Sequence, residues 1–281
     1  MGEEETSGAV VVTGSGGGLG AASARALAGR GRGFVLSDLL ADAVVPLRTE
    51  LASHPVVIVE GDLGDPDVVG QVASAVEAQG GLRALVHAAG LSPTMADAMT
   101  IFRVNLFATR RLVDALGPLA QPGAAAVLIA SQAGHMAAAG VPPELAAVLD
   151  DPLVPDFADR LCDLGFAAAT TEPGAAYALS KHAVQRLAVS LAPEWGARGA
   201  RIVSLSPGMI DTGMGRQEFA AQPFMRTIQE KTPVERRLGR PEEVAAVVAF
   251  LCSPSASFVS GVDWIVDGGS TGQVMAAPPA A

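Results

Sequence analysis

The feature that most constrains the fold is a regular alternation of short apolar runs with segments of helical length. The runs are nearly continuous in Val, Ile, Leu and Ala, which is typical of strands buried on both faces of a parallel sheet. Strands that alternate with helices through right-handed crossovers predict one doubly wound α/β domain over residues 1–281, with a seven-stranded parallel sheet and helices on both faces. The expected strands are Ala9–Val12, Gly33–Ser37, Val56–Glu60, Ala84–Ala88, Ala125–Ala130, Arg201–Ser206 and Trp264–Val266.

Helical segments are expected between these strands. Pro241 followed by two glutamates is typical of a helix start, because proline fixes φ and acids favour the positive end of the helix dipole. The two ends of the chain, residues 1–7 and 273–281, are expected to be flexible. The expected helices are Gly18–Arg30, Pro66–Gln79, Met95–Leu119, Gly174–Arg198 and Pro241–Leu251.

Composition excludes several classes of protein. The net charge is −10, whereas nucleic-acid binding requires a basic surface, so no nucleic-acid partner is expected. No apolar run is long enough to cross a membrane, and "MGEEETSG" resembles neither a signal nor a transit peptide. Cys162 and Cys252 form no disulfide framework and no metal-ligand spacing, so no metal site is predicted. We expect a cytoplasmic protein without a membrane partner.

One acidic segment interrupts the alternation at residues 137–172. It contains seven acidic residues and one arginine, a balance of −6. Phe157, Leu161 and Leu164 are spaced to share one face of a short helix. We therefore expect a helical acidic insertion just before the helix that carries Tyr177.

A glycine-rich turn follows the first expected strand in "VVVTGSGGGLGAASARAL". Gly14, Gly18 and Gly20 let the backbone approach a pyrophosphate, and the next helix presents free N–H groups at its positive end. Asp38 ends the second expected strand, where a carboxylate binds ribose hydroxyls, although a helix N-cap is the alternative. The combination predicts a Rossmann-type dinucleotide site.

The surroundings of Asp38 favour NAD over NADP. A 2′-phosphate would be repelled by this carboxylate, and neither residues 37–40 nor the glycine turn contains Arg or Lys. Asp62 in "EGDLGD" follows the third expected strand and is placed to accept a hydrogen bond from the adenine amino group. A helix-start acid is the alternative for Asp62.

The only tyrosine, Tyr177, lies one helical turn before Lys181, which is one of two lysines. Residues at positions i and i+4 share one face of a helix. A free tyrosine is a poor base at neutral pH, but a nearby ammonium lowers its pKa. The pair therefore predicts a general acid/base acting on a carbonyl or alcohol.

A series of short motifs resembles the short-chain dehydrogenase/reductase family over residues 8–270. The motifs are "TGSGGGLG", "HAAG", the Asn of "RVNLFA", the Ser of "IASQAG", "YALSK" and "SPGMIDTGM". The resemblance implies a catalytic tetrad of Asn105, Ser131, Tyr177 and Lys181. Tyr177 would exchange a proton with the substrate oxygen, and Ser131 would hydrogen-bond that oxygen. Lys181 would lower the pKa of Tyr177 and hold the nicotinamide ribose, and Asn105 would position a water molecule.

The resemblance also extends the cofactor site, since Ile210 and Thr212 match positions that touch the nicotinamide carboxamide. Residues 213–232 would form part of a substrate lid, in which several apolar side chains either line a pocket or pack against the sheet. These apolar residues are Phe219, Phe224, Met225 and Ile228. The expected cofactor-binding residues are Gly14, Ser15, Gly18, Leu19, Gly20, Asp38, Asp62, Leu63, Ala88, Ala89, Gly90, Tyr177, Lys181, Pro207, Gly208, Ile210 and Thr212.

Two departures from the family pattern stand out. His87 replaces the usual Asn in "HAAG", and we interpret it as a buried, hydrogen-bonded histidine rather than a catalytic one. The spacing of 46 positions between Ser131 and Tyr177 is unusually long. Members of the 3α-hydroxysteroid dehydrogenase/carbonyl reductase type carry a comparable insertion, which implies a homodimer, with a homotetramer as the alternative.

The predicted function is NAD-dependent hydride transfer between nicotinamide and a secondary alcohol or ketone, with a bulky apolar or steroid-like compound as a candidate substrate. The alternatives are a biosynthetic ketoreductase and a catalytically silent protein that senses NAD or docks a partner through the acidic segment. A broken tetrad would favour the silent protein, whereas all four residue types are present.

Overall fold

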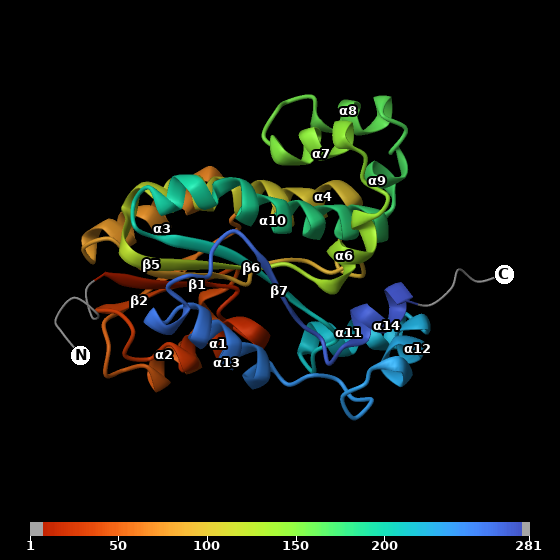
Figure 1. Cartoon of the computed structure of the whole chain (residues 1–281). Coiled ribbons are helices and arrows are strands. Elements are labelled where there is room, and N and C mark those ends of the chain that lie inside the picture. The colour runs from red at the N-terminus through yellow and green to blue at the C-terminus, as the bar shows by residue number, and fades with distance from the viewer. Residues whose placement is uncertain (1–7, 277–281) are drawn as a thin grey trace.

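Seven parallel strands form the central layer of the structure, a computed structural model that describes residues 8–276 (Figure 1). Their spatial order is β3-β2-β1-β4-β5-β6-β7, so the order reverses between β1 and β4. Ligands of doubly wound sheets bind at such a switch point, outside the carboxyl ends of the strands. The predicted fold class is confirmed. The strands are β1 (Ala9–Thr13), β2 (Gly33–Asp38), β3 (Val56–Glu60), β4 (Leu82–His87), β5 (Ala120–Ile129), β6 (Arg201–Pro207) and β7 (Asp263–Val266).

The strands lie close to their predicted positions, with one difference at their amino ends. β4 and β5 begin earlier than predicted, because Leu82 pairs with Ala120 ahead of a shift in register. The apolar runs located the other strands well because a strand such as β1 is buried along its whole length and needs no polar face.

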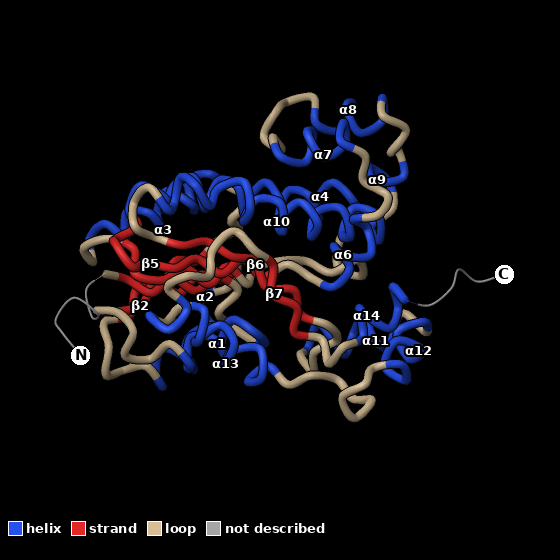
Figure 2. Tube along the Cα trace, viewed as in Figure 1, coloured by secondary structure: helices blue, strands red, loops and turns tan. Residues whose placement is uncertain are grey.

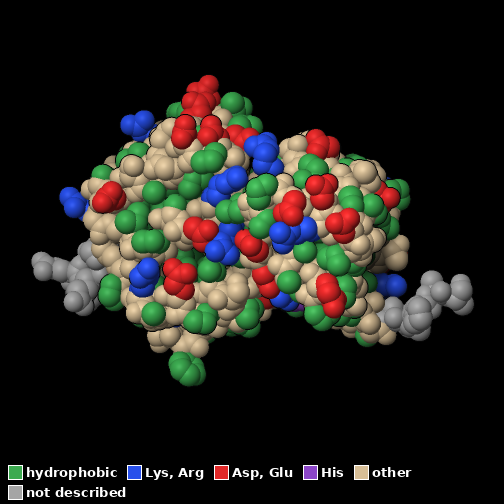
Figure 3. Space-filling model, turned by 90° about the horizontal axis from the view of Figure 1, so that it is seen from above, with side chains coloured by type: hydrophobic (Ala, Val, Ile, Leu, Met, Phe, Trp, Pro, Cys, Tyr) green, Lys and Arg blue, Asp and Glu red, His purple; other side chains and the backbone are tan. Residues whose placement is uncertain are grey.

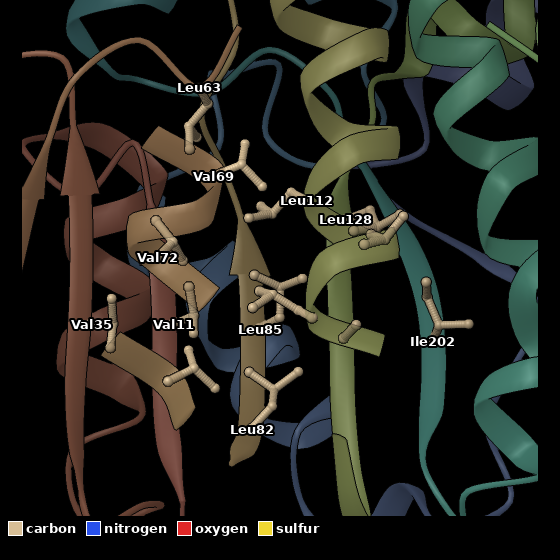
Figure 4. Close-up of a cluster of buried hydrophobic side chains, with 14 of the residues drawn as sticks. Val11, Val35, Leu63, Val69, Val72, Leu82, Leu85, Leu112, Leu128 and Ile202 are labelled. Carbon is tan, nitrogen blue, oxygen red and sulfur yellow. The ribbon is translucent and has the colours of Figure 1, made fainter. Parts of the chain in front are cut away.

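Helices cover both faces of the sheet, as the helical layers around the strands in Figure 2 show. On the first face, Val72 and Leu112 pack with Val11, Leu85 and Leu128 in a continuous buried cluster (Figure 4). The same cluster includes Val184 and Leu191 of the long helix α10. Their packing fixes α10 against the sheet and so positions the residues that project from it. The helices of this face are α3 (Pro66–Ala78), α5 (Ala108–Leu116) and α10 (Pro173–Gly196).

On the second face, helix α2 was not predicted from the sequence. It contains Pro46, whose ring is disfavoured inside a helix, but Val44 and Leu47 are buried against the sheet and hold the segment in helical form. Helices α1 and α13 lie against each other. They correspond to the helices predicted at Gly18–Arg30 and Pro241–Leu251. The helices of this face are α1 (Gly18–Ala26), α2 (Ala41–Glu50) and α13 (Pro241–Leu251).

The single helix predicted over residues 95–119 is divided by a wider turn. The middle piece has π-helical hydrogen bonding around Asn105. Such single turns occur often at functional sites, and apolar periodicity does not reveal them. The four pieces are α4 (Ala98–Phe102), η2 (Arg103–Phe107), α5 and η3 (Gly117–Leu119).

The acidic segment, residues 137–172, contains short helices that stand above α10 and α4 in Figure 1. Phe157 is buried and contacts Phe102 and Phe107 through ring centroids 5.1 and 5.0 Å apart. Leu161 is buried as expected, whereas the predicted third member of that face, Leu164, is exposed because its helix ends before it. The helices around and within the segment are α6 (Gln132–Ala138), α7 (Pro143–Asp150), α8 (Phe157–Asp163) and α9 (Ala168–Thr171).

The last part of the chain places three helices beyond the carboxyl end of β7, where α11, α12 and α14 lie together (Figure 1). Residues 273–276, part of the end expected to be flexible, belong to α14. The predicted flexible residues 1–7 and 277–281 lie outside the described residues. The remaining elements are α11 (Gly213–Ala221), α12 (Phe224–Lys231), η4 (Pro254–Ala256) and α14 (Ser270–Ala276).

The surface carries interspersed acidic and basic side chains on the face seen from above in Figure 3. Among residues 8–276, no helix is long and apolar enough to span a membrane.

Candidate active site

The glycine-rich turn joins β1 to α1 at the switch point of the sheet. Gly14 has φ of +63°, and a Cβ there would lie 2.8 Å from the backbone nitrogen of Ala89. A Cβ at Gly20 would overlap the carbonyl oxygen of Gly14. Glycine is therefore required at both positions, because only a bare backbone fits between the first turn and the end of β4.

A cavity of about 570 Å³ opens over this turn. The N-terminus of α1 faces it without a side-chain cap and without an acid in the first turn, as an anion-binding helix end requires. The size, the close backbone approach and the open helix end fit a dinucleotide. The predicted residues that line this cavity are Gly14, Gly18, Leu19, Gly20, Asp38, Asp62, Leu63, Ala88, Ala89, Gly90 and Thr212.

Ser15 is the predicted residue of the turn that does not line this cavity. Its hydroxyl is buried and donates to the carbonyl oxygen of Ser37 at 3.2 Å. The side chain therefore ties the turn to β2.

Asp38 is fixed at the end of β2 by two backbone donors. The N–H of Gly16 donates to Oδ2 and that of Leu39 to Oδ1, both at 2.8 Å. The carboxylate thus stands between the glycine turn and the wall of the cavity, with room left for further donors such as ribose hydroxyls.

Asp62 lines the same cavity but forms an ion pair that the sequence did not suggest. Arg103 Nη1 donates to its Oδ2 at 2.6 Å, and the N–H of Gly64 donates to Oδ1 at 2.8 Å. Burial raises the pKa of Asp62, but the two hydrogen bonds and the charge of Arg103 outweigh burial, and the net pKa is lowered. Arg103 was not expected beside Asp62, because it comes from η2, far away in sequence.

A second cavity of about 370 Å³ adjoins the first and contains the side chains of Ser131, Tyr177 and Lys181. The two cavities share lining residues, so they lie side by side. The shared residues are Leu19, Ala88, Gly90, Leu91, Thr212 and Met214. The predicted residues Pro207, Gly208 and Ile210 line the second cavity only.

Ser131 stands at the carboxyl end of β5 as the N-cap of α6. Its Oγ accepts a hydrogen bond from the N–H of Ala133 at 3.2 Å, and its carbonyl oxygen accepts one from Gln185 Nε2 at 3.2 Å. Gln185 belongs to α10, so the serine is held by its own helix and by the helix that carries Tyr177.

Lys181 and Tyr177 lie one turn apart on α10, as predicted, with Nζ 5.9 Å from the centre of the phenol ring. Nζ donates to the carbonyl oxygen of Ile129 at 2.9 Å. Burial lowers the pKa of Lys181 to about 8, while the nearby carboxylate of Glu218 acts in the opposite direction.

The pKa of Tyr177 is raised above its usual value, in the direction opposite to the effect expected of the Lys181 ammonium. Burial of the phenol is the main cause and the charge of Glu218 the second, while a hydrogen bond with Ser131 acts in the opposite direction. An ammonium or a bound, positively charged nicotinamide favours the phenolate, whereas desolvation and the carboxylate of Glu218 from α11 favour the neutral phenol.

Asn105 is buried in the π-helical turn and holds the loop after β4. Its Oδ1 accepts from the N–H of Leu91 at 2.7 Å, and its Nδ2 donates to the Leu91 carbonyl oxygen at 3.0 Å. A Cβ at Gly90 would lie 3.1 Å from Asn105 Oδ1 and 3.4 Å from Lys181 Nζ. The structure therefore brings Asn105 next to Lys181, although Asn105 lines neither cavity.

His87 is buried and hydrogen-bonded at both ring nitrogens, as the sequence interpretation expected. Thr13 Oγ1 lies 2.8 Å from Nδ1 and Thr109 Oγ1 2.8 Å from Nε2. Burial lowers its pKa to about 3, with a smaller contribution from the charge of Lys181. The ring is neutral at physiological pH and serves to join β1, β4 and α5.

The segment expected to form a lid lines the second cavity through Phe224, Met225 and Ile228, whereas Phe219 does not line it. The same segment contributes Glu218, which the sequence analysis missed. A single acid on an otherwise unremarkable helix gives no spacing signal, and only the tertiary structure brings it to the cavity.

The acidic segment contributes nothing to either cavity: none of residues 139–172 lines them. Within residues 8–276, no three His, Cys, Asp or Glu side chains gather where they could hold a metal ion.

Known families match most of the chain. The short chain dehydrogenase family matches residues 8–145, and the enoyl-(acyl carrier protein) reductase family matches residues 165–271. A tropinone reductase homolog of Arabidopsis thaliana is 41% identical over 100 residues, which are 36% of this chain and 38% of that protein. This match therefore spans well under half the length of that relative.

Other relatives match a longer part of the chain than either family alone. A short-chain dehydrogenase/reductase of Alternaria brassicicola is 32% identical over 74% of this chain and 76% of that protein. The 3-alpha-hydroxysteroid dehydrogenase/carbonyl reductase of Comamonas testosteroni is 29% identical over 78% and 88%. The crystal structure of a short-chain glucose/ribitol dehydrogenase from Brucella melitensis is 27% identical, covers 95% of this chain and 98% of its own, and has a TM-score of 0.73. Together with the two cavities at the switch point, these matches show that the chain belongs to the short-chain dehydrogenase/reductase family.

Proposed function

We propose that the protein is an NAD-dependent oxidoreductase that interconverts a secondary alcohol and a ketone. The observation that carries the proposal is that Ser131, Tyr177 and Lys181 line one cavity, which adjoins the cavity over the glycine-rich turn. A carbonyl oxygen placed against Ser131 and Tyr177 would have its carbon facing the shared wall of the two cavities.

The chemistry is divided between the cofactor and the chain. When bound, the dinucleotide supplies or accepts the hydride at its nicotinamide ring. In ketone reduction, Tyr177 donates its phenol proton to the carbonyl oxygen as the carbon gains the hydride, and Ser131 steadies the same oxygen by hydrogen bonding. In alcohol oxidation the same proton returns to Tyr177. The raised pKa keeps Tyr177 protonated at neutral pH, as a proton donor requires.

Two features support NAD rather than NADP. Asp38 places a carboxylate at the end of β2, where it would repel a 2′-phosphate and accept bonds from ribose hydroxyls. Arg103 is the cation within this cavity, and it is already paired with Asp62. We expect Asp38→Ala to weaken NAD binding more than NADP binding, measured by fluorescence titration of the reduced cofactors. Equal losses would mean that Asp38 does not contact the ribose.

The catalytic assignment is tested by Tyr177→Phe, which keeps the ring and removes the proton. Turnover of secondary alcohols, sterols included, should fall by at least a thousandfold, on the order of the contribution of acid–base catalysis. Cofactor binding should survive, which separates chemistry from folding. Appreciable residual turnover would exclude Tyr177 as the acid/base. Retained cofactor binding with no turnover in the unmodified protein would favour the alternative of a cofactor-sensing protein.

The second cavity sets the size and polarity of the substrate in this proposal. A cavity of about 370 Å³ with mostly apolar walls suits a compact cyclic or bulky apolar ketone. The name of the Comamonas relative includes a hydroxysteroid, which supports a steroid-like substrate for this chain as one candidate. A ketoreductase of a biosynthetic pathway would use the same residues.

We also propose a homodimer formed at the β7 edge of the sheet. Phe258, Val262 and Ile265, which lie in β7 or shortly before it in the chain, all have exposed side chains, and unpaired edge strands recruit partners. The acidic segment already covers the α4 and α10 side through Phe157 and its neighbours. Sedimentation equilibrium should show a dimer that Phe258→Asp converts to monomers, whereas an unchanged dimer would move the interface elsewhere.

The free thiols of Cys162 and Cys252 support a cytoplasmic location, where thiols stay reduced. Fractionation of cells expressing the full chain would test this part of the proposal.

A further inference from the structure

The substrate cavity contains a carboxylate that neither the fold nor the proposed chemistry requires. Glu218 projects from α11 and lines the cavity with Lys181 as the other charged lining residue. Within residues 8–276, no hydrogen bond or ion pair reaches its carboxylate. Its carboxylate interacts through charge, at longer range, with Lys181 and Tyr177.

The surroundings of this carboxylate are unfavourable to a charge. The same cavity is lined by the apolar side chains of Met214, Phe224, Met225 and Ile228. Burial raises the pKa of Glu218, and Lys181 compensates only in part. A partly desolvated carboxylate without a partner costs free energy, and a cationic ligand group in the same cavity offsets that cost.

We propose that Glu218 determines substrate specificity by pairing with a protonated amino group, so that the substrates are amino ketones and the matching amino alcohols. This inference rests on the proposed alcohol/ketone oxidoreductase function and adds a substrate class to it. The carbonyl end of such a molecule lies against Ser131 and Tyr177, and its ammonium end points toward α11. Hydroxyl groups also donate to a carboxylate, but hydrogen bonds between two charged groups are stronger.

Pairing with Glu218 would also act on the proton donor. The charge of Glu218 raises the pKa of Tyr177, so an ammonium that neutralises it lowers that pKa toward the working range of an acid/base. A cationic substrate therefore gains in binding and in proton transfer, whereas an anionic ketone is repelled by Glu218.

Three ring ketones of similar shape test the inference: 4-(dimethylamino)cyclohexanone is cationic, 4-isopropylcyclohexanone is its neutral isostere, and 4-oxocyclohexanecarboxylate is anionic. We expect kcat/KM at pH 7 to favour the cation over the isostere by about tenfold, which corresponds to about 1.4 kcal/mol, and to be lowest for the anion. In Glu218→Gln this ratio should fall to about one and the anion should improve relative to the isostere.

Glu230→Gln on the neighbouring α12 is the matched control, because Glu230 is exposed and does not line the cavity. It should leave the tenfold ratio intact. A ratio that stays the same in Glu218→Gln, or that falls equally in Glu230→Gln, overturns the role of Glu218 while turnover of the neutral ketone upholds the proposed function.

A binding readout keeps the inference testable if no ketone is reduced. Calorimetry with N,N-dimethylcyclohexylammonium in the presence of reduced cofactor should show binding to the unmodified protein and about tenfold weaker binding to Glu218→Gln. Thermal unfolding of each variant verifies that it is folded. Equal binding to both proteins counts against the ammonium site, whatever the outcome for activity.

Discussion

Replacing Lys181 by methionine should make the protein more stable at neutral pH while it abolishes turnover. Lys181 is buried, and burial lowers its pKa from the usual 10.5 to about 8. Methionine has a similar length, no charge and adaptable packing, so it fills the same space without the cost of a buried ammonium.

The magnitude follows from the two effects of the substitution. Lowering the pKa from 10.5 to about 8 corresponds to about 3 kcal/mol of free energy that the folded state loses by holding a charged Lys181 at pH 7. The substitution also removes the 2.9 Å hydrogen bond to the carbonyl oxygen of Ile129, which costs about 1 kcal/mol. The variant should therefore be more stable by about 2 kcal/mol at pH 7.

The dependence on pH has a definite sign. Since the pKa is lower in the folded state, the unfolded chain binds more protons between pH 8 and 10.5, and the stability of the unmodified protein rises through that interval. The advantage of the variant should disappear near pH 10 and reverse by about 1 kcal/mol above it, where only the lost hydrogen bond remains.

Urea unfolding monitored by tryptophan fluorescence, without cofactor, measures both quantities. Lys231→Met is the control, because Lys231 is exposed and is the only other lysine. The reasoning is refuted if Lys181→Met is less stable than the unmodified protein at pH 7, or if the difference between them does not change from pH 7 to pH 10.5.

Three further substitutions probe other parts of the structure. The unmodified protein should lose about 3 kcal/mol of stability between pH 6.5 and 4, because the unfolded chain binds a proton that buried His87 does not, and His87→Asn should remove this loss in urea titrations. Phe157→Ala should cost about 4 kcal/mol by leaving a cavity beside Phe102 and Phe107, and hydrogen exchange should speed up in residues 143–171 first. Gly14→Ala should cost about 2 kcal/mol and weaken binding of NADH in fluorescence titrations, because φ is +63° and the new Cβ meets the backbone of Ala88 and Ala89 just after β4.

The sequence predicted the parallel sheet well because central strands such as β1 and β6 are buried along their whole length and appear as nearly continuous apolar runs. It predicted helices less well where tertiary packing overrides local preference. Helix α2 was not predicted because it contains Pro46. The π-helical turn contains Asn105, which accepts a hydrogen bond from the N–H of Leu91, and no periodicity in the sequence indicates this turn. Leu164 was placed on a buried face because spacing alone does not reveal where a short helix ends.

In the site too, local features were predicted and features set by tertiary contacts were not. Tyr177 and Lys181 were found because both are local to one helix and rare in this chain. The effect of burial and of Glu218 on the pKa of Tyr177 could not be predicted, since burial and a contact with another element leave no local pattern. Arg103 beside Asp62 was missed for the same reason: long-range pairs leave no pattern in the sequence.

The shared wall between the two cavities has a consequence for inhibitor design. Leu19, Gly90 and Thr212 line both cavities, so the two spaces are separated by no more than these shared residues. A single compound with a ribose-like diol at one end and a ring ketone at the other would occupy both. Joining the two fragments converts the second binding event into an intramolecular one, so the linked molecule should bind far more tightly than either fragment alone.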